Sequence, residues 1–199
     1  MSKQISIDGG TSPAKLWTIV VDPGHGGRDP GAVGRVHGLR ERDVVLEIAQ
    51  RMVAISETGR IGVVLTRDSN KISRTLQERA RKGTTLRADA FLSLHCNSFG
   101  NTTVHGHETF FWHSNLRGQR LAQFIVSDIV RATGWANRGV KSNDTFGVLR
   151  GTQGLAAVLV EYDFISNPAR EAELIKPETL QLLAETTYYA VDRYLSIHG

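Results

Sequence analysis

Cysteine, long apolar runs and clustered charge are all scarce in this chain of 199 residues. The single cysteine, Cys96, excludes a framework of intrachain disulfides. No apolar run approaches the roughly 20 residues that a transmembrane helix needs, and residues 1–10 lack the apolar core of a secretory signal peptide. The basic residues are scattered and never form a run of five. The sequence therefore excludes a disulfide-stapled or membrane-spanning protein, and it carries no nucleic-acid footprint.

The composition is that of an ordinary globular protein, with 40% hydrophobic and 22% charged residues. A chain of this length is expected to form one domain with a substantial core. The net charge of +4 is a mild bias toward polyanionic surroundings, such as nucleic acid, an anionic membrane or an acidic envelope polymer.

Apolar segments of two kinds alternate along the chain. Short continuous runs typical of buried strands occupy residues 17–21, 62–66, 90–94, 108–112 and 155–160. Helical spacing of apolar residues marks residues 43–56, 73–87, 116–133 and 178–195. Because strands alternate with helices, we expect one α/β domain with a twisted, mostly parallel central sheet of about six strands, flanked by helices on both faces.

Three of the expected strands lead into a histidine or a glutamate. His25 lies in the glycine-rich turn after the first strand, His95 follows residues 90–94, and Glu161 follows residues 155–160. The carboxyl ends of parallel strands lie along one sheet edge, where ligands usually bind. Glu41 lies at the start of the first expected helix, where a carboxylate is favoured, and it can face the same edge.

Two histidines and one carboxylate form a known zinc shell, and a further glutamate near the zinc's water can serve as general base. The spacings of 16 and 54 residues between the three ligand candidates match no compact local motif. Each residue also has a structural interpretation, as a satisfied strand-end histidine, a helix-dipole partner or an ion-pair residue. Several ionisable groups at the ends of core strands are costly without partners, which favours a shared site.

The remaining histidines and the cysteine are assigned away from this edge. Cys96 follows His95, so on a strand it points to the opposite face and is expected in the core. The other histidines are expected on the surface or periphery: His37, His105, His107, His113 and His198.

Five short blocks give the chain an ordered pattern. They are residues 22–32 (DPGHGGRDPGA), 41–43 (ERD), 65–67 (LTR), 93–98 (SLHCNS) and 159–167 (LVEYDFISN). In this order they resemble the zinc-dependent N-acetylmuramoyl-L-alanine amidases of the amidase-3 type, which include bacterial cell-division, sporulation and germination amidases and phage endolysins. Residues 137–141 and 148–150 match further family segments, and the resemblance runs from about residue 18 to about residue 194.

The resemblance implies that His25, Glu41 and His95 bind zinc and that Glu161 is the catalytic glutamate. It also implies the reaction, which is hydrolysis of the amide joining the lactyl group of N-acetylmuramic acid to L-alanine of the peptidoglycan stem peptide. Such an enzyme lyses or remodels the cell wall as an endolysin or autolysin.

Three further positions in the matched blocks have expected or open roles. Arg67 and Asn97 also match the family, and we expect structural or supporting roles for them. Asp163 stands where the family usually has glycine, and its effect beside the catalytic glutamate is left open.

Residues 1–199 are expected to be the catalytic domain, with residues 1–14 as a leader segment and no wall-binding module. Some division amidases carry a blocking helix after the second histidine. Only residues 97–107 separate His95 from Glu108, so we expect an open site without such a helix.

Peptidoglycan, as glycan strand plus stem peptide, is the expected partner, with no nucleic acid, no membrane insertion and a monomeric protein. The enzyme would act at the bacterial wall, in the periplasm or outside, after release at lysis or as an exported domain. Two alternatives are a zinc peptidase or deacylase with the same metal shell, and a wall-binding protein with a degenerate site. The presence of all three ligand candidates and Glu161 argues against the second.

Overall fold

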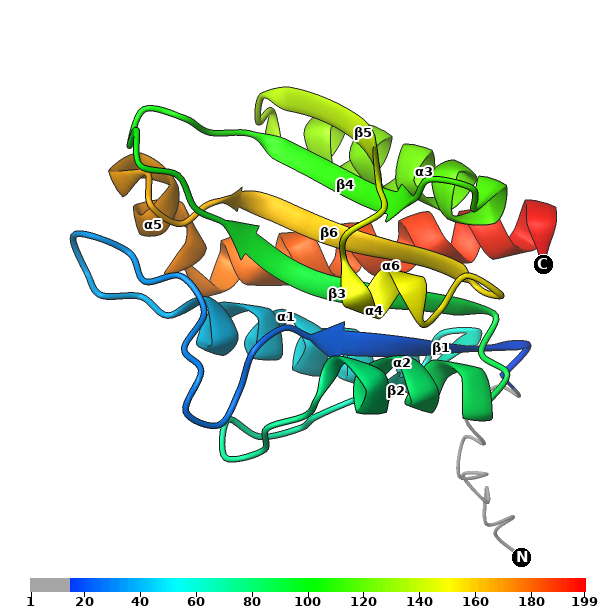
Figure 1. The fold of residues 1–199 in the computed structure, drawn as a ribbon. Helices are drawn as coiled ribbons and strands as arrows, with labels where there is room; N and C mark the ends of the chain where they lie inside the picture. The colour runs from blue at the N-terminus through cyan, green and yellow to red at the C-terminus, as the bar shows by residue number, and fades with distance from the viewer. Residues whose placement is uncertain (1–14) are drawn as a thin grey trace, which may run out of the picture.

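The computed structural model describes residues 15–199. These residues form a six-stranded sheet in the order β2-β1-β3-β6-β4-β5, with helices packed against it (Figure 1). The strands are β1 (Trp17–Pro23), β2 (Ile61–Leu65), β3 (Ala90–Asn97), β4 (His107–Trp112), β5 (Asn137–Asn143) and β6 (Ala156–Phe164). The helices are α1 (Glu41–Ser56), α2 (Leu76–Thr85), α3 (Leu116–Thr133), α4 (Gly147–Arg150), α5 (Pro168–Leu174) and α6 (Pro177–His198).

The sheet is mostly parallel, as the sequence predicts. Strands β2, β1, β3 and β6 run in one direction, whereas β4 pairs antiparallel with β6 and parallel with β5. Because β4 runs opposite to β6, the first residues of β4 lie beside the last residues of β6. Glu108 is paired with Glu161 in this way. The reversal therefore brings a second carboxylate to the edge where the predicted site lies.

Alternating side chains of the central strands supply two cores. Ile19 and Val21 of β1 belong to the larger core, which α1, α3 and α6 complete. Val20 belongs to the smaller core, which includes Val148 and Leu149 of α4. Figure 1 shows α1 and α6 behind the sheet and the short helices α2 and α4 in front of it. Helices thus cover both faces, which confirms the predicted architecture.

Three elements are not indicated by the sequence pattern. β5 is the polar edge segment Asn-Arg-Gly-Val-Lys-Ser-Asn with no fully buried residue, so it lacks the apolar run of a core strand. Helices α4 and α5 span 4 and 7 residues, too few for a periodic pattern.

The second predicted helix begins later than residue 73, where the sequence places its start. Thr75 and Glu78 form a capping box that starts α2 at Leu76.

No helix among residues 15–199 has the length and apolar character needed to cross a bilayer. The leader predicted for residues 1–14 lies outside the described residues.

Candidate active site

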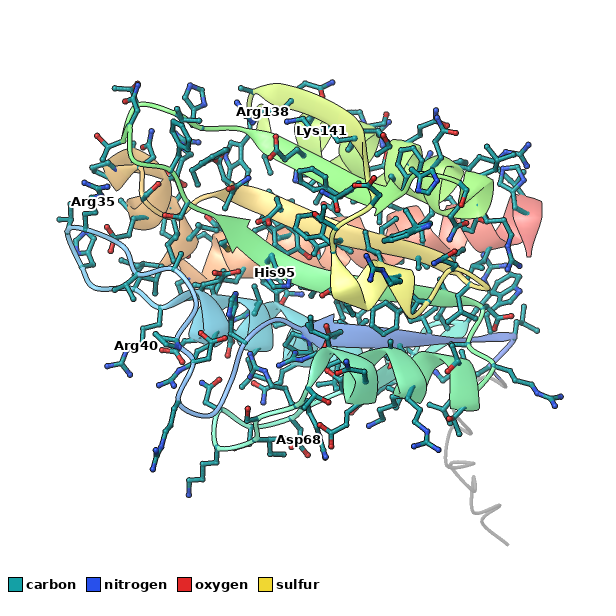
Figure 2. The ribbon with its side chains drawn as sticks, in the orientation of Figure 1. Arg35, Arg40, Asp68, His95, Arg138 and Lys141 are labelled. Carbon is teal, nitrogen blue, oxygen red and sulfur yellow. The ribbon has the colours of Figure 1, made fainter. Side chains whose placement is uncertain are left out.

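The predicted site residues meet at the carboxyl ends of β1, β3 and β6. His95 of β3 is paired with Glu161 of β6. The backbone N–H of Gly24, just after β1, donates to the carbonyl of Leu94 at 2.9 Å. The next residue, His25, is therefore held beside the end of β3, and its ring lies 5.0 Å from that of His95. Figure 2 labels His95 on β3, in the middle of the sheet.

The turn that carries His25 depends on glycine at two positions. A Cβ at Gly24 would lie 2.3 Å from Cε1 of His95, and a Cβ at Gly31 would lie 2.6 Å from both Glu41 and His25. Gly31 also has a φ of +67°, and His25 itself has a φ of +62°. A left-handed conformation is uncommon for a histidine. The turn is therefore a strained, closely packed loop that fits tightly around the two imidazoles.

Two buried arginines hold this turn in place through hydrogen bonds to its backbone carbonyls. Arg67 donates to the carbonyls of Pro23 at 3.0 Å and Gly24 at 2.7 Å. Arg79 donates to the carbonyl of His25 at 2.5 Å and to the Asp22 carboxylate at 2.8 Å. Burial and the nearby charge of Arg79 lower the pKa of Arg67 to about 10, so it remains charged at neutral pH. These bonds give Arg67 the structural role expected from the sequence.

Glu41 is the first residue of α1, and its carboxylate lies between the two histidines. Its Oε1 is 3.0 Å from Nε2 of His25 and 2.9 Å from Nδ1 of His95. The backbone N–H groups of Cys96 and Ala32 donate to its two oxygens at 3.0 and 2.8 Å. Burial acts to raise the pKa of Glu41, but the hydrogen bonds and charges of His25 and His95 outweigh it and hold the pKa well below its usual range. Glu41 is therefore an ionised carboxylate.

The three side chains fit a metal ion. One ligand atom from each of His25, Glu41 and His95 can be chosen so that all lie within 4.8 Å of one another. Two imidazoles and one carboxylate are the donor set of catalytic zinc sites. Asp29 adds the usual outer partner, because its Oδ2 lies 2.8 Å from Nδ1 of His25 and fixes the ring with Nε2 toward Glu41.

Glu161 faces the same cavity but is not part of this cluster. The cavity has a volume of about 400 Å³, and Glu161, His25, His95 and Phe146 are among its lining residues. Oε2 of Glu161 is buried and has no hydrogen-bond partner within residues 15–199. Burial, together with the negative charges of Glu41 and Glu108, raises the pKa of Glu161 well above its usual range. Such a carboxyl group is suited to accepting and releasing a proton.

The other expectations have mixed outcomes. Cys96 is buried in the larger core, on the face opposite His95, as predicted. The connection from β3 to β4 contains no helix, so no blocking helix follows His95.

The prediction of a surface position is wrong for His107, which is fully buried at the start of β4. It lies 3.3 Å from the Tyr162 carbonyl and 3.1 Å from the Thr109 hydroxyl, contacts that the sequence pattern around a short strand does not reveal.

Sequence reasoning also missed residues that support the site. Asp29 contacts the ring of His25, and Arg79 donates to the backbone carbonyl of His25 from 54 residues further along the chain. Of the two, only Asp29 lies in one of the five sequence blocks, residues 22–32. Asn97 has a supporting role as expected, since its Nδ2 donates to Glu108 at 2.7 Å. The sequence indicates no role for Glu108, although the antiparallel pairing places it beside Glu161.

Comparisons with known proteins agree with this geometry. The Amidase_3 family model, described as N-acetylmuramoyl-L-alanine amidase, matches residues 19–193. The N-acetylmuramoyl-L-alanine amidase LytC of Bacillus subtilis is 37% identical over 166 residues, which cover 82% of this chain and 32% of LytC. The endolysin of Bacillus phage SPP1 is 35% identical over 172 residues, which cover 84% of this chain and 62% of the endolysin.

Comparison with a solved structure also indicates an N-acetylmuramoyl-L-alanine amidase. The crystal structure of N-acetylmuramoyl-L-alanine amidase from Clostridium difficile 630 matches with a TM-score of 0.87 and 32% identity, over 94% of this chain and 100% of that chain. The chain therefore belongs to the Amidase_3 family of N-acetylmuramoyl-L-alanine amidases.

Proposed function

We propose that this chain hydrolyses the amide between the lactyl group of N-acetylmuramic acid and L-alanine of the stem peptide, with zinc held by His25, Glu41 and His95. The main support is that the residues able to hold a metal and the residue able to transfer a proton are different and face one cavity. Three ligand atoms are gathered within 4.8 Å. Glu161 lies across the cavity with Oε2 unpartnered within the described residues. Catalytic zinc sites combine three protein ligands with an open position for water, and a carboxylate beside that water can act as general base.

Zinc bound there would polarise the scissile carbonyl and acidify water. The protein's own residues supply the rest of the reaction. Oε2 of Glu161 accepts the proton of the attacking water, and the raised pKa of Glu161 suits it to hold that proton. Glu161 then donates the proton to the nitrogen of the departing L-alanine. The products are a free lactyl carboxylate and a stem peptide with a free amino terminus.

His25 and His95 must be neutral to act as ligands, and each has a partner that orients it. Asp29 accepts from Nδ1 of His25. The ring of His95 packs on the bare backbone of Gly24. Glu41 stays ionised because the hydrogen bonds from His25 and His95 lower its pKa. The strained turn and the first residue of α1 are thus held in place before any metal binds, which lowers the cost of forming the site.

We also propose that the enzyme acts as a monomer at the bacterial wall, in an autolysin or endolysin role. The similarity to the phage SPP1 endolysin supports the endolysin role, and the similarity to the amidase LytC of Bacillus subtilis supports the autolysin role.

Product analysis tests the reaction. Purified protein is incubated with peptidoglycan, with and without a chelator, and the new ends are identified by mass spectrometry. We expect free L-alanine amino termini that disappear with the chelator and with Glu161→Gln. Glu185→Gln, which changes an exposed glutamate on α6, is the matched control and retains activity. Cleavage elsewhere in the stem peptide would instead indicate a zinc peptidase, and full activity of Glu161→Gln would refute the assigned base.

A further inference from the structure

Two cations share one buried carboxylate beside the proposed catalytic glutamate. Oε2 of Glu108 is 2.7 Å from Nε of Arg138 and 2.5 Å from Nζ of Lys141, while Oε1 accepts from Asn97 at 2.7 Å. Glu108 is 3% exposed, whereas the side chains of Arg138 and Lys141 are 34% and 38% exposed. We call Glu108, Arg138, Lys141 and Asn97 the Glu108 cluster.

The Glu108 cluster carries a net positive charge. One carboxylate offsets only one of the two cations, and Asn97 already occupies the second carboxylate oxygen. Within residues 15–199, the Arg138 and Lys141 side chains form no other hydrogen bonds, so the two Nη groups of Arg138 keep their donors for a ligand. Contacts with aromatic rings fix both cations, since Arg138 lies 4.8 Å from the ring of Phe164 and Lys141 lies 5.7 Å from that of Phe110.

This charge lies next to the reaction cavity. Glu108 is the cross-strand partner of Glu161, and directly paired side chains in an antiparallel sheet have Cβ atoms about 5 Å apart. Phe110 packs edge-on against Phe146 at 5.2 Å, and Phe146 lines the cavity. The cluster therefore lies beside two residues of the cavity lining, Glu161 and Phe146, and extends from β4 to β5, where Figure 2 labels Arg138 and Lys141.

The substrate of the proposed function can place an anionic group close to the scissile amide. A residue in an extended chain spans about 3.5 Å, so an anionic group on the second residue of a stem peptide lies roughly 7 Å from the scissile amide. Both cations contact Glu108, the direct cross-strand neighbour of Glu161, so they lie within one residue pair of the proposed base. Arginine is well suited to a carboxylate because its planar donors match the carboxylate geometry.

We propose that Arg138 and Lys141 are specificity-determining residues that bind the free α-carboxylate of the second stem-peptide residue. The inference rests on the proposed amidase function and adds to it a preference for isoglutamate over the neutral isoglutamine at this position. Glu108 offsets part of the charge of the two cations, which the rings of Phe164 and Phe110 hold in place.

The test compares two uncross-linked glycan-strand substrates that differ only at this residue, which carries either the α-carboxylate or the α-amide. The measured quantity is the ratio of kcat/KM for the two substrates. Dividing one value by the other removes any effect of a variant on the catalytic step itself. For a partly exposed charge pair we expect the wild-type ratio to favour the carboxylate about fivefold, and to fall at high salt.

Two variants should shift the ratio in opposite directions. Lys141→Gln removes one cation and should bring the ratio close to unity, whereas Lys141→Arg should retain the preference. Glu108→Gln releases both cations from their carboxylate and should raise the ratio above that of the wild type. Lys176→Gln, which removes an exposed lysine that is bonded to Glu173, is the matched control and should leave the ratio unchanged.

A wild-type ratio of unity, or a shift in the same direction for Lys141→Gln and Glu108→Gln, would overturn the proposal. A merely structural cluster predicts that the variants lose activity on both substrates equally. If the wild type cleaves neither substrate, the proposed amidase function fails. If it cleaves both equally, only the specificity fails.

Discussion

Acidification should destabilise the fold through His107. Its side chain is fully buried at the start of β4. Burial lowers the pKa of His107 to about 4 from the usual 6.5, against the opposing influences of the Tyr162 carbonyl and the Glu108 charge. Because the folded-state pKa lies below the unfolded value, the unfolded chain binds more protons between these values. Stability from the neutral ring is complete above pH 6.5 and is lost as pH falls toward 4.

The magnitude follows from these two pKa values. Between about pH 7 and about pH 5, protonation of the unfolded histidine should cost about 2 kcal/mol of unfolding free energy. Urea unfolding followed by circular dichroism at the two pH values measures this loss. In His107→Gln the side chain does not titrate, so the variant should lose about 2 kcal/mol less than the wild type over this interval.

His113→Gln is the matched control, because His113 is an exposed histidine at the other end of β4. It should follow the wild-type pH dependence. If His107→Gln and the wild type lose equal stability between the two pH values, His107 is not a buried neutral group and the reasoning is refuted.

Three other substitutions test how the site is held together. Gly24→Ala should abolish most amidase activity, because the added Cβ would lie 2.3 Å from the imidazole of His95. Gly100→Ala is the control and should be as active as the wild type, since a Cβ at Gly100 would meet open space. Equal activities of the two variants would show that the close approach of Gly24 to His95 is unimportant. Asp29→Asn should weaken zinc affinity about 10- to 100-fold, measured by competition with a chelator, and an unchanged affinity would remove Asp29 from the site. Glu171→Ala should cost about 3 kcal/mol of unfolding free energy, since its buried carboxylate accepts from three backbone N–H groups in residues 36–39. A urea titration checks this loss against Glu173→Ala, a partly exposed site on the same helix, and a similar loss in both variants would contradict it.

The central strands and the proximity of the site residues could be predicted from the sequence. Both predictions rest on apolar runs that mark the strands and on the polar residues that follow them. An apolar run followed by His95, and another followed by Glu161, place these side chains on paired strands. Parallel order then brings His25 to the same edge. The polar strand β5 could not be predicted in this way, because its side chains are partly exposed and it is defined by pairing with β4.

The surface position predicted for His107 is wrong for a related reason. His107 directly precedes the predicted strand 108–112, and polar residues at such a point indicate a surface loop. The antiparallel pairing of β4 with β6 overrides that pattern by burying His107 and Glu108 against the end of β6. Tertiary pairing of this kind leaves no local signal in the chain.

Asp163, which departs from the family pattern, has a clear structural role. Its Oδ1 accepts from the backbone N–H groups of Gly106 and Phe164, each at 2.7 Å. It therefore ties the start of β4 to the end of β6. Burial raises the pKa of Asp163 against these bonds, and its Oδ2 is buried without a partner within the described residues.

The zinc content of two variants tests most directly the claim that ligation and proton transfer are separate. Glu161→Gln should retain about one zinc per chain and yet release no L-alanine amino termini. Glu41→Gln should lose most of its zinc, because it removes the proposed charged ligand between the two histidines. Full zinc occupancy in Glu41→Gln, or loss of zinc in Glu161→Gln, would contradict the account.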